Sequence, residues 1–359
     1  MNKTICTLRD IPQPVNIGGD YYITQSALML GSMAEGEVRL KNADRSKDTK
    51  LMIALLKSMG CQISVGDSEI IMSPSNSPVS LDGKEIHYGG GVYPLALVIG
   101  YLAGKGRKCT LNYTNDINPI FIAKLTKSFS EIGIGLKHNN ESHHIEFGQN
   151  QLIPIEREIS AVFPHTKDSL LMLGLSSGRS VAIREKLLSD IKVENIIIKL
   201  GGKLTFRETK PELVDNPDDP RKKLRQARFS YKREMILHPS THLRGAVIEV
   251  PADSYQLAAW LALAILKKTE FRSEGLHITA ETKDFVNYLK SAGAGISLAK
   301  NSSPDSGIKK IDLYLGKSEI SGRKISGNTA AGLMKKIALM AILAAGRPAT
   351  TLIRDIKEY

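Results

Sequence analysis

The chain repeats one pattern of helix and strand along its length, and this repetition limits its fold more than any single motif does. An apolar segment that predicts a helix is followed by a small or glycine-rich stop and a short strand. The pattern occurs at 27–40, 95–111, 170–183, 257–271 and 337–352. In four copies we expect a left-handed glycine cap at the end of the helix: Gly36, Gly104, Gly178 and Gly346.

A second, more amphipathic helix alternates with the first and is also followed by a strand. Its copies end at Gly60, Gly133, Gly201 and Gly293. The first three lie about 70 residues apart, which predicts one βαβαββ unit per interval. The last interval is longer because segment 210–233 is inserted. This segment begins with Pro, Asp and Asn and then becomes strongly basic, so we expect a loop there.

These repeats predict an α/β protein of two domains. The first is expected at 15–245, with three βαβαββ units and the insertion 210–233. The second is expected at 246–359 together with 1–14. The first helix type has one copy more than the second, which predicts that the second domain is incomplete. A partner could supply the rest, the protein could tolerate a reduced domain, or the sequence could be truncated.

Charge narrows the class of partner. Lys and Arg number 49 against 37 Asp and Glu, a formal net charge of +12. This excess favours nucleic acid, acidic lipid or phosphorylated metabolites. Nucleic-acid binding is disfavoured, because the sequence contains no zinc finger, RNP motif or basic zipper.

Other sequence features bear on location and cofactors. The three cysteines have no CxxC spacing, the N-terminus lacks an apolar leader, and the apolar runs are too short for a membrane span. We therefore expect a cytoplasmic protein with no membrane segment. No P-loop, GxGxxG, GxSxG or HExxH motif occurs, so no cofactor and no metal is expected. The pair His143-His144 is more typical of a turn than of a metal site.

The opening stretch 15–63 and the segment VPADSYQLAAW (250–260) resemble EPSP synthases, members of the enolpyruvyl transferase family. The matching positions in the first stretch are Asn42, Ser46, Asp48 and Gly60. The resemblance runs diffusely from about residue 15 to 355. It implies two domains, each of three βαβαββ units around a pseudo-threefold axis, that close on substrates between them. It also implies a transferase of the shikimate pathway for aromatic amino acids, which moves the enolpyruvyl group of phosphoenolpyruvate to shikimate 3-phosphate.

The same resemblance implies where substrates bind, and there this sequence departs from the family. Family Lys, Ser and Arg positions are occupied by Tyr21, Tyr22 and Ser26, and an Arg-Pro pair by Asn118-Pro119. A glycine turn with Gly90 and Gly91 could hold an anion, although a plain tight turn is favoured. Lost charge-assisted contacts at about 1.5–3 kcal/mol each make the standard reaction improbable.

The positions that bind the shikimate ring in the family read Thr166, Lys167 and Asp168, where Lys167 is a new cation. Thr166 and Asp168 are equally well explained as helix caps. Ser189 matches a serine that contacts the substrate phosphate, although a helix N-cap is slightly favoured. The family general base falls near Gly332. We interpret the terminal pair Lys357-Glu358 as a coincidental match to a family Lys-Glu pair.

Further candidates lie near the insertion. Its cations could form a lid over an anionic ligand, although a solvated face is favoured: Arg221, Lys222, Lys223, Arg225, Arg228, Lys232 and Arg233. His238, His242 and Arg244 follow the insertion, and Asp253 with Tyr255 opens the second domain. A His with Asp or Tyr could form an acid–base set. Candidate catalytic residues are therefore Lys167, Asp168, Asp253 and Tyr255, with Arg244 as a further candidate for substrate binding.

Three functions remain open from the sequence. The first is a divergent enzyme that binds a shikimate-like or other cyclic anionic metabolite in an interdomain cleft and whose chemistry could be altered. The second is a non-catalytic homologue that serves as a binding or scaffold partner, with a homo- or hetero-oligomer completing the second domain. The third is a nucleic-acid binder that uses the basic surface.

Overall fold

The structure is a computed structural model, and it describes most of the chain. The described residues are 10–74, 80–114, 117–139, 141–148, 155–159, 164–186, 188–209, 212–216, 219–226, 232–239, 242–301, 310–326, 329–330, 333, 336–346 and 350–354. Outside them lie Arg228, Gly332, Lys357 and Glu358, together with the side chains of Arg221, Lys222, Lys223 and Arg225.

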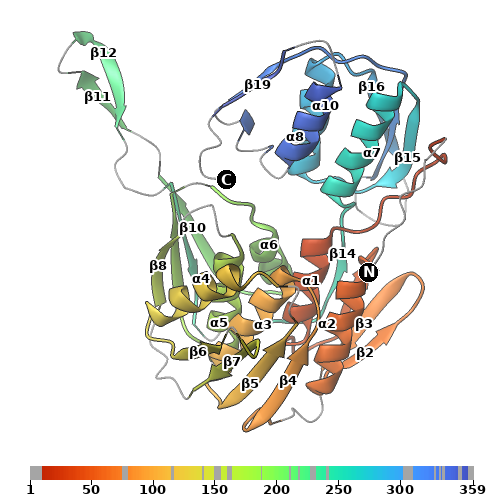
Figure 1. Cartoon of the computed structure of the whole chain (residues 1–359). Helices are drawn as coiled ribbons and strands as arrows, with labels where there is room; N and C mark the ends of the chain where they lie inside the picture. The colour runs from red at the N-terminus through yellow and green to blue at the C-terminus, as the bar shows by residue number, and fades with distance from the viewer. Residues whose placement is uncertain are drawn as a thin grey trace. The chain divides into compact units, whose positions relative to one another are not determined.

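Three four-stranded sheets share one strand order (Figure 1). The first runs β14 (Ala246–Glu249), β1 (Val38–Lys41), β3 (Glu69–Ser73) and β2 (Gln62–Val65). The second runs β4 (Lys84–Tyr88), β5 (Cys109–Tyr113), β7 (His144–Phe147) and β6 (Leu136–Asn139). The third runs β8 (Ile155–Ile159), β9 (Val181–Glu185), β13 (Arg233–Leu237) and β10 (Leu204–Glu208).

Strand direction confirms the predicted βαβαββ unit. In the second and third sheets the first two strands are parallel, as a helical crossover requires. The last two strands of each unit pair antiparallel with their neighbours. The first sheet differs, because its four strands do not come from one continuous stretch of the chain. Its edge strand β14 comes from far along the chain, after the third unit.

Helices of the first type fill the interior of these units. They are α1 (Tyr21–Gly31), α3 (Val92–Lys105) and α5 (Pro164–Ser177), and most described side chains of α1 and α3 are buried. The amphipathic helices α2 (Lys47–Ser58), α4 (Pro119–Ser130) and α6 (Lys192–Lys199) bury one face each. Helices α3 and α5 approach closely, because a Cβ on Gly100 would lie only 2.0 Å from the carbonyl oxygen of Ser169.

Left-handed glycines follow the amphipathic helices, whereas only one of the four caps predicted for the apolar helices is correct. Positive φ angles of 80–106° follow the amphipathic helices, at Gly60, Gly133, Gly201 and Gly293. Among the apolar helices, Gly178 is left-handed, whereas the predictions for Gly36, Gly104 and Gly346 are wrong. Gly104 lies inside α3 against Leu173 and Ser176, and Gly36 meets the backbone of Gly245. Close packing, not a cap, accounts for those two glycines.

The insertion contains a β-hairpin, which corrects the expected loop. Strands β11 (Glu212–Asn216) and β12 (Asp219–Gln226) pair antiparallel in a sheet of their own. They lie in sequence between β10 and β13, which pair with each other. The insertion therefore lengthens the connection between β10 and β13. The predicted basic lid also loses Arg233, because its side chain is buried in an ion pair with Glu185.

The chain divides into two compact units, described separately here. The larger unit comprises Tyr22–Lys41 and Arg45–Ile248, and the smaller one comprises Met1–Tyr21, Asn42–Asp44 and Glu249–Tyr359. The boundaries expected from the sequence, 15–245 and 246–359 with 1–14, stay a prediction. Among the described residues, no helix is both long enough and apolar enough to cross a membrane.

The smaller unit contains one further repeat and part of another. Its first part runs α7 (Ser254–Lys267), β15 (Phe271–Leu276), α8 (Ala280–Ser291), β16 (Ile296–Asn301) and β17 (Lys310–Leu315). A parallel pair follows on either side of a helix: β18 (Lys324–Ile325), α10 (Ile337–Ala345) and β19 (Leu352–Ile353). The N-terminal segment lies along β15, where Val15 N donates to Arg272 O at 2.8 Å.

Candidate functional site

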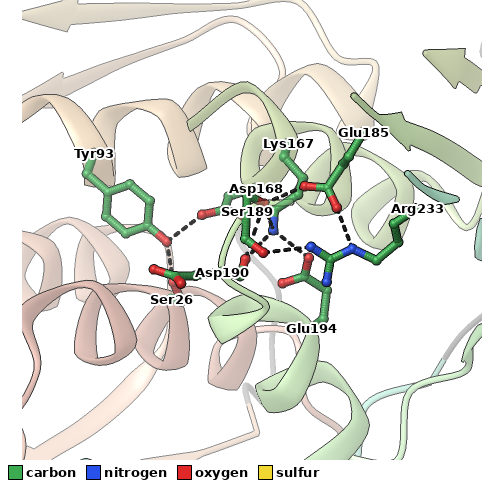
Figure 2. Close-up of polar contacts among 9 residues, drawn as sticks. All are labelled: Ser26, Tyr93, Lys167, Asp168, Glu185, Ser189, Asp190, Glu194 and Arg233. Carbon is green, nitrogen blue, oxygen red and sulfur yellow. Dashed lines mark hydrogen bonds and ion pairs between the residues drawn. The ribbon is translucent and has the colours of Figure 1, made fainter. Parts of the chain in front are cut away.

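A buried polar cluster lies in the larger unit where α5 begins and where β9 leads into α6 (Figure 2). Lys167 lies in α5 and Glu185 ends β9. Ser189 follows in the connecting segment, Glu194 lies in the first turn of α6, and Arg233 opens β13. Four elements of the third unit therefore bring charged side chains to one place.

Lys167 is fully engaged within this cluster. Its Nζ lies 2.6 Å from Oε1 of Glu194, and the two side chains are 1% and 0% exposed. The same ammonium donates to Ser189 Oγ at 2.8 Å and to the backbone oxygen of Asp190. Lys167 thus donates two hydrogen bonds within the cluster, and its charge is paired with the Glu194 carboxylate. At 1% exposure and with its charge paired, Lys167 is poorly placed to bind a ligand directly.

Arg233 and Glu185 form the second ion pair. Arg233 Nε lies 2.7 Å from Glu185 Oε2, and its terminal nitrogen donates to the backbone oxygen of Ser189 at 2.7 Å. Ser189 Oγ in turn donates to Glu185. The pair follows from strand register, because Arg233 is directly opposite Glu185 in the β13–β9 ladder. Ser189 thereby links the two ion pairs into one network.

Acidic groups outnumber basic ones here. Glu185, Glu194 and the nearby Asp168 face the cations Lys167 and Arg233. Burial alone would lower the pKa of Lys167. The combined attraction of Glu194, Asp168 and Glu185 outweighs that effect and raises the pKa above its ordinary value. Lys167 is therefore charged at neutral pH, and the carboxylates of the cluster neutralise its charge.

A chain of hydroxyl groups connects the cluster to α1 and α3. Tyr93 in α3 donates from its hydroxyl to Asp168 Oδ2 at 2.9 Å, and that hydroxyl lies 2.6 Å from Ser26 Oγ in α1. Ser26 donates to the backbone oxygen of Tyr22. Helices α1, α3 and α5 are thus joined by one polar network (Figure 2).

Aromatic rings gather beside this network. The Tyr22 and Tyr93 ring centroids lie 4.8 Å apart in an edge contact, and Tyr93 and His165 lie 5.1 Å apart. Phe121 adds a ring 5.5 Å from His165. The Nζ of Lys192 lies 5.6 Å from the centroid of Tyr22. Tyr22, Tyr93, Phe121 and His165 are called the aromatic group below.

The helix-cap alternatives for this region are wrong. Thr166 and Asp168 lie inside α5, which begins at Pro164, and both side chains are buried. Helix α6 has Ile191 at its N-cap, so Ser189 does not cap it. Asn118, by contrast, does cap α4, since its Oδ1 accepts from Ile120 N at 2.9 Å.

The glycine turn before α3 is tight. Gly91 caps α3 without a side-chain hydrogen bond. A Cβ on Gly90 would lie 2.0 Å from the hydroxyl oxygen of Tyr88. Burial, reinforced by Asp48, raises the pKa of Tyr88 above its ordinary value. Gly90 is therefore needed for packing, whatever its part in binding.

Asp253, a predicted catalytic residue in the smaller unit, accepts hydrogen bonds from three backbone amides. Its Oδ1 accepts from Tyr255 N and Gln256 N at the start of α7, and its Oδ2 accepts from Tyr21 N at 3.2 Å. This carboxylate therefore caps α7 and also bonds the start of α1. The Tyr255 side chain is 48% exposed.

The predicted residues after the insertion have separate partners. His238 Nε2 lies 2.7 Å from Thr205 Oγ1, and the exposed His242 contacts Glu35. Arg244 donates from its backbone N to Leu200 O at 2.6 Å, and its side chain lies near Gly201. Within the described residues, no group of three His, Cys, Asp or Glu side chains is arranged to hold a metal ion.

Sequence reasoning missed Glu185, Glu194, Tyr93 and His165. Glu194 carried a weak signal, since it falls on the otherwise apolar face of a strongly amphipathic helix. A hollow of about 700 Å³ lies elsewhere, beside Lys84, Lys108 and Lys137, and none of the predicted site residues lines it. We take the buried cluster and the aromatic group as the candidate site, because charge and ring chemistry meet there.

Comparisons with known proteins bear on the whole chain. Residues 7–227 match the family model described as EPSP synthase (3-phosphoshikimate 1-carboxyvinyltransferase). The 3-phosphoshikimate 1-carboxyvinyltransferase of Synechocystis sp. is 25% identical over 351 residues, which are 96% of this chain and 73% of the relative. That of Streptococcus uberis is 21% identical over 96% of this chain and 75% of its own.

Solved structures show the same fold. EPSP synthase from Acinetobacter baumannii matches with a TM-score of 0.70 at 17% identity, over 95% of this chain and 72% of the other. The enolpyruvyl transferase NikO from Streptomyces tendae matches with a TM-score of 0.65 at 11% identity, over 96% and 74% of the two chains.

Proposed function

Because the chain belongs to the EPSP synthase (3-phosphoshikimate 1-carboxyvinyltransferase) family, we propose that it is a divergent member that binds a shikimate-like ring without the standard enolpyruvyl transfer. The observation that carries this proposal is the engagement of Lys167. Its ammonium is held by Glu194, Ser189 and Asp190.

Charge argues against a doubly anionic ligand at this cluster. A phosphate group would approach Glu185, Glu194 and Asp168, whose charges already offset those of Lys167 and Arg233. Like charges in a partly desolvated site repel strongly. Nor can the family Lys and Arg of the first motif compensate, because by the resemblance Tyr21 and Ser26 occupy their positions. We expect shikimate 3-phosphate and phosphoenolpyruvate to bind weakly.

A ring with hydroxyl groups and one carboxylate fits the surroundings better. Tyr22, Phe121 and His165 are partly exposed and offer ring faces for apolar contact. The Asp168 carboxylate, which already accepts from Tyr93, offers acceptor oxygens for a ring hydroxyl. Lys192, close to the Tyr22 ring, offers one positive charge for a carboxylate.

Calorimetry with shikimate, shikimate 3-phosphate and phosphoenolpyruvate tests this proposal. We expect shikimate to bind more tightly than its 3-phosphate, and the two phosphorylated substrates together to release no inorganic phosphate. Lys192→Met should weaken shikimate binding by about tenfold, the size of one lost charge-assisted contact. Lys57→Met, a change of an exposed lysine on α2, is the matched control and should leave binding unchanged.

Two results would contradict the proposal. Phosphate release that depends on both phosphorylated substrates would show that the standard transfer occurs. Tighter binding of the 3-phosphate than of shikimate would show that the acidic cluster does not determine which ligand the protein prefers. Failure of all three compounds to bind would instead favour the second candidate, a non-catalytic partner protein, for which the exposed apolar side of α10 argues.

A further inference from the structure

The hollow beside Lys84, Lys108 and Lys137 lies at one end of the second sheet, which is formed by β4, β5, β7 and β6 (Figure 1). Strand register places one residue of each strand in a single row across this end: Lys84, Cys109, Phe147 and Leu136. All four residues of the row line the hollow. The sheet therefore builds the hollow from four strands at once.

The hollow is separate from the candidate site. Strand β4 begins at Lys84 in the hollow, whereas the Gly90–Gly91 turn and Tyr93 follow its other end. Helix α4 gives the same result. Its last residue, Ser130, lines the hollow, and Phe121 of the aromatic group lies nine residues earlier, about 14 Å along the helix. A ligand in the hollow would therefore leave the candidate site unoccupied.

The walls of the hollow are suited to an organic molecule. Cys109, Ile134, Leu136 and Phe147 supply an apolar part, and Thr110 adds a hydroxyl group. The volume of about 700 Å³ lies in the range of small-molecule sites, which combine apolar walls with a few polar groups. A bare inorganic ion would fill little of this space.

The charge of the lining is positive. The ammonium groups of its three lysines form no ion pair with any other residue that the structure describes. Among the described lining residues the only carboxylate is that of Glu146, which lies 3.6 Å from His144. Three positive charges against one negative leave +2. The exposed neighbours Asp82 and Arg107 add one charge of each sign. The acidic candidate site makes no use of this positive charge.

We propose that the hollow binds a phosphate monoester with an apolar body, such as an aryl phosphate. A phosphate monoester carries a charge of about −1.5 to −2 at neutral pH and presents three acceptor oxygens. It therefore matches both the net charge and the three ammonium donors, whereas a single carboxylate supplies half of that charge. The apolar walls hold the body. Shikimate 3-phosphate and phosphoenolpyruvate, whose bodies are polar, gain little from those walls.

Calorimetry with phenyl phosphate, inorganic phosphate and phenol tests the proposal. We expect phenyl phosphate to bind at least tenfold more tightly than the other two, because each of them lacks one half of the ligand. Lys108→Met should weaken the binding of phenyl phosphate by about tenfold, the size of one lost charge-assisted contact. Lys199→Met, a change of an exposed lysine on α6, is the matched control and should leave binding unchanged.

A second pair of variants fills the hollow without changing its charge. A Cβ on Gly148, which lines the hollow, would have Gly135 O as its nearest neighbour at 3.8 Å, an ordinary contact. Gly148→Leu should therefore fold normally but weaken the binding of phenyl phosphate by at least tenfold. Gly148→Ala, which adds a single carbon, should change binding by less than about threefold. Circular dichroism melts of both variants check that the fold is kept.

Three results would overturn the proposal. The first is the absence of phenyl phosphate binding, and the second is inorganic phosphate or phenol binding as tightly as phenyl phosphate. The third is unchanged binding of phenyl phosphate in Lys108→Met or in a folded Gly148→Leu, which would place the ligand elsewhere. Lys192→Met should leave phenyl phosphate binding unchanged, and Lys108→Met should leave shikimate binding unchanged. This proposal can thus fail independently of the proposed function.

Discussion

Nζ of Lys167 and Oε1 of Glu194 lie 2.6 Å apart in a place where neither side chain is more than 1% exposed. Two charges at this depth depend on each other, because an unpaired charge in the interior costs several kcal/mol. The pair fixes the start of α5 against the start of α6. It also neutralises Lys167, which the family resemblance places at a position that binds the shikimate ring.

Breaking the pair should destabilise the larger unit. We expect Lys167→Met and Glu194→Gln each to lower the free energy of unfolding by about 3–5 kcal/mol, and the double variant to lose less than the sum. Urea unfolding should be followed by far-ultraviolet circular dichroism, because the single tryptophan, Trp260, lies in the smaller unit.

An exposed ion pair of the same length provides the control for that cycle. Lys186 and Glu158 also lie 2.6 Å apart, but their side chains are 57% and 37% exposed. Lys186→Met should change the free energy of unfolding by less than about 1 kcal/mol. Equal effects of Lys186→Met and Lys167→Met would show that burial does not set the strength of the inner pair.

Ser189→Ala tests the link between the two ion pairs. The change removes an acceptor from Lys167 and a donor from Glu185, so we expect a loss of about 1–3 kcal/mol in the free energy of unfolding. Ser128→Ala on α4, whose hydroxyl bonds only its own helix at 3.1 Å, should cost far less. Similar losses of stability in Ser189→Ala and Ser128→Ala would show that the Ser189 hydroxyl does not couple the two ion pairs.

Gly100→Ala tests the close approach of α3 and α5. The added Cβ would lie 2.0 Å from Ser169 O, so the two helices would have to separate. We expect a loss of about 1–3 kcal/mol in the free energy of unfolding. Gly89→Ala is the control, because its nearest neighbour would be a side-chain carbon of Thr114 at 3.5 Å. Thermal melts should separate the two variants clearly.

The stability of the larger unit should fall at acidic pH because of His138. Burial, and then the nearby His144 and His143, lower the pKa of His138, whose Nε2 lies 2.6 Å from the Tyr113 hydroxyl. The unfolded chain therefore binds the proton at higher pH than the folded chain does. Stability is complete above the unfolded pKa of about 6.5 and decreases as the pH falls through the lower folded value.

Because His138 is partly exposed, this effect should stay below about 1 kcal/mol. His138→Gln should flatten the dependence of the melting temperature on pH for the larger unit. His87→Gln, at a side chain that is 73% exposed, should not. Circular dichroism melts at a series of pH values check both. An unchanged pH dependence in His138→Gln would assign acid sensitivity to other groups.

The repeat, the βαβαββ unit and the glycines that end the amphipathic helices were predictable from local sequence. Apolar periodicity and glycine spacing act over a few residues, and tertiary packing did not override them at Gly60 or Gly133. The cap predictions failed at Gly36 and Gly104, because a glycine needed for close packing is indistinguishable in sequence from one needed for a cap.

The candidate site was less predictable. Lys167 and Ser189 were identified by resemblance, but their partners Glu194 and Arg233 were not. Arg233 was expected in a basic loop and instead pairs with Glu185, because the β13–β9 register places the two opposite each other. Such pairing depends on which strands become neighbours, and one sequence holds little information about that.

Strand β14 has a consequence for how the chain reaches its native state during synthesis. The ribosome produces β1 long before β14, so the first sheet must wait with one edge unpaired while the second and third units emerge. An open edge with apolar neighbours is a site for mispairing between nascent chains. A copy of residues 246–249 placed ahead of β1 would let the first sheet close its edge before the later units are made.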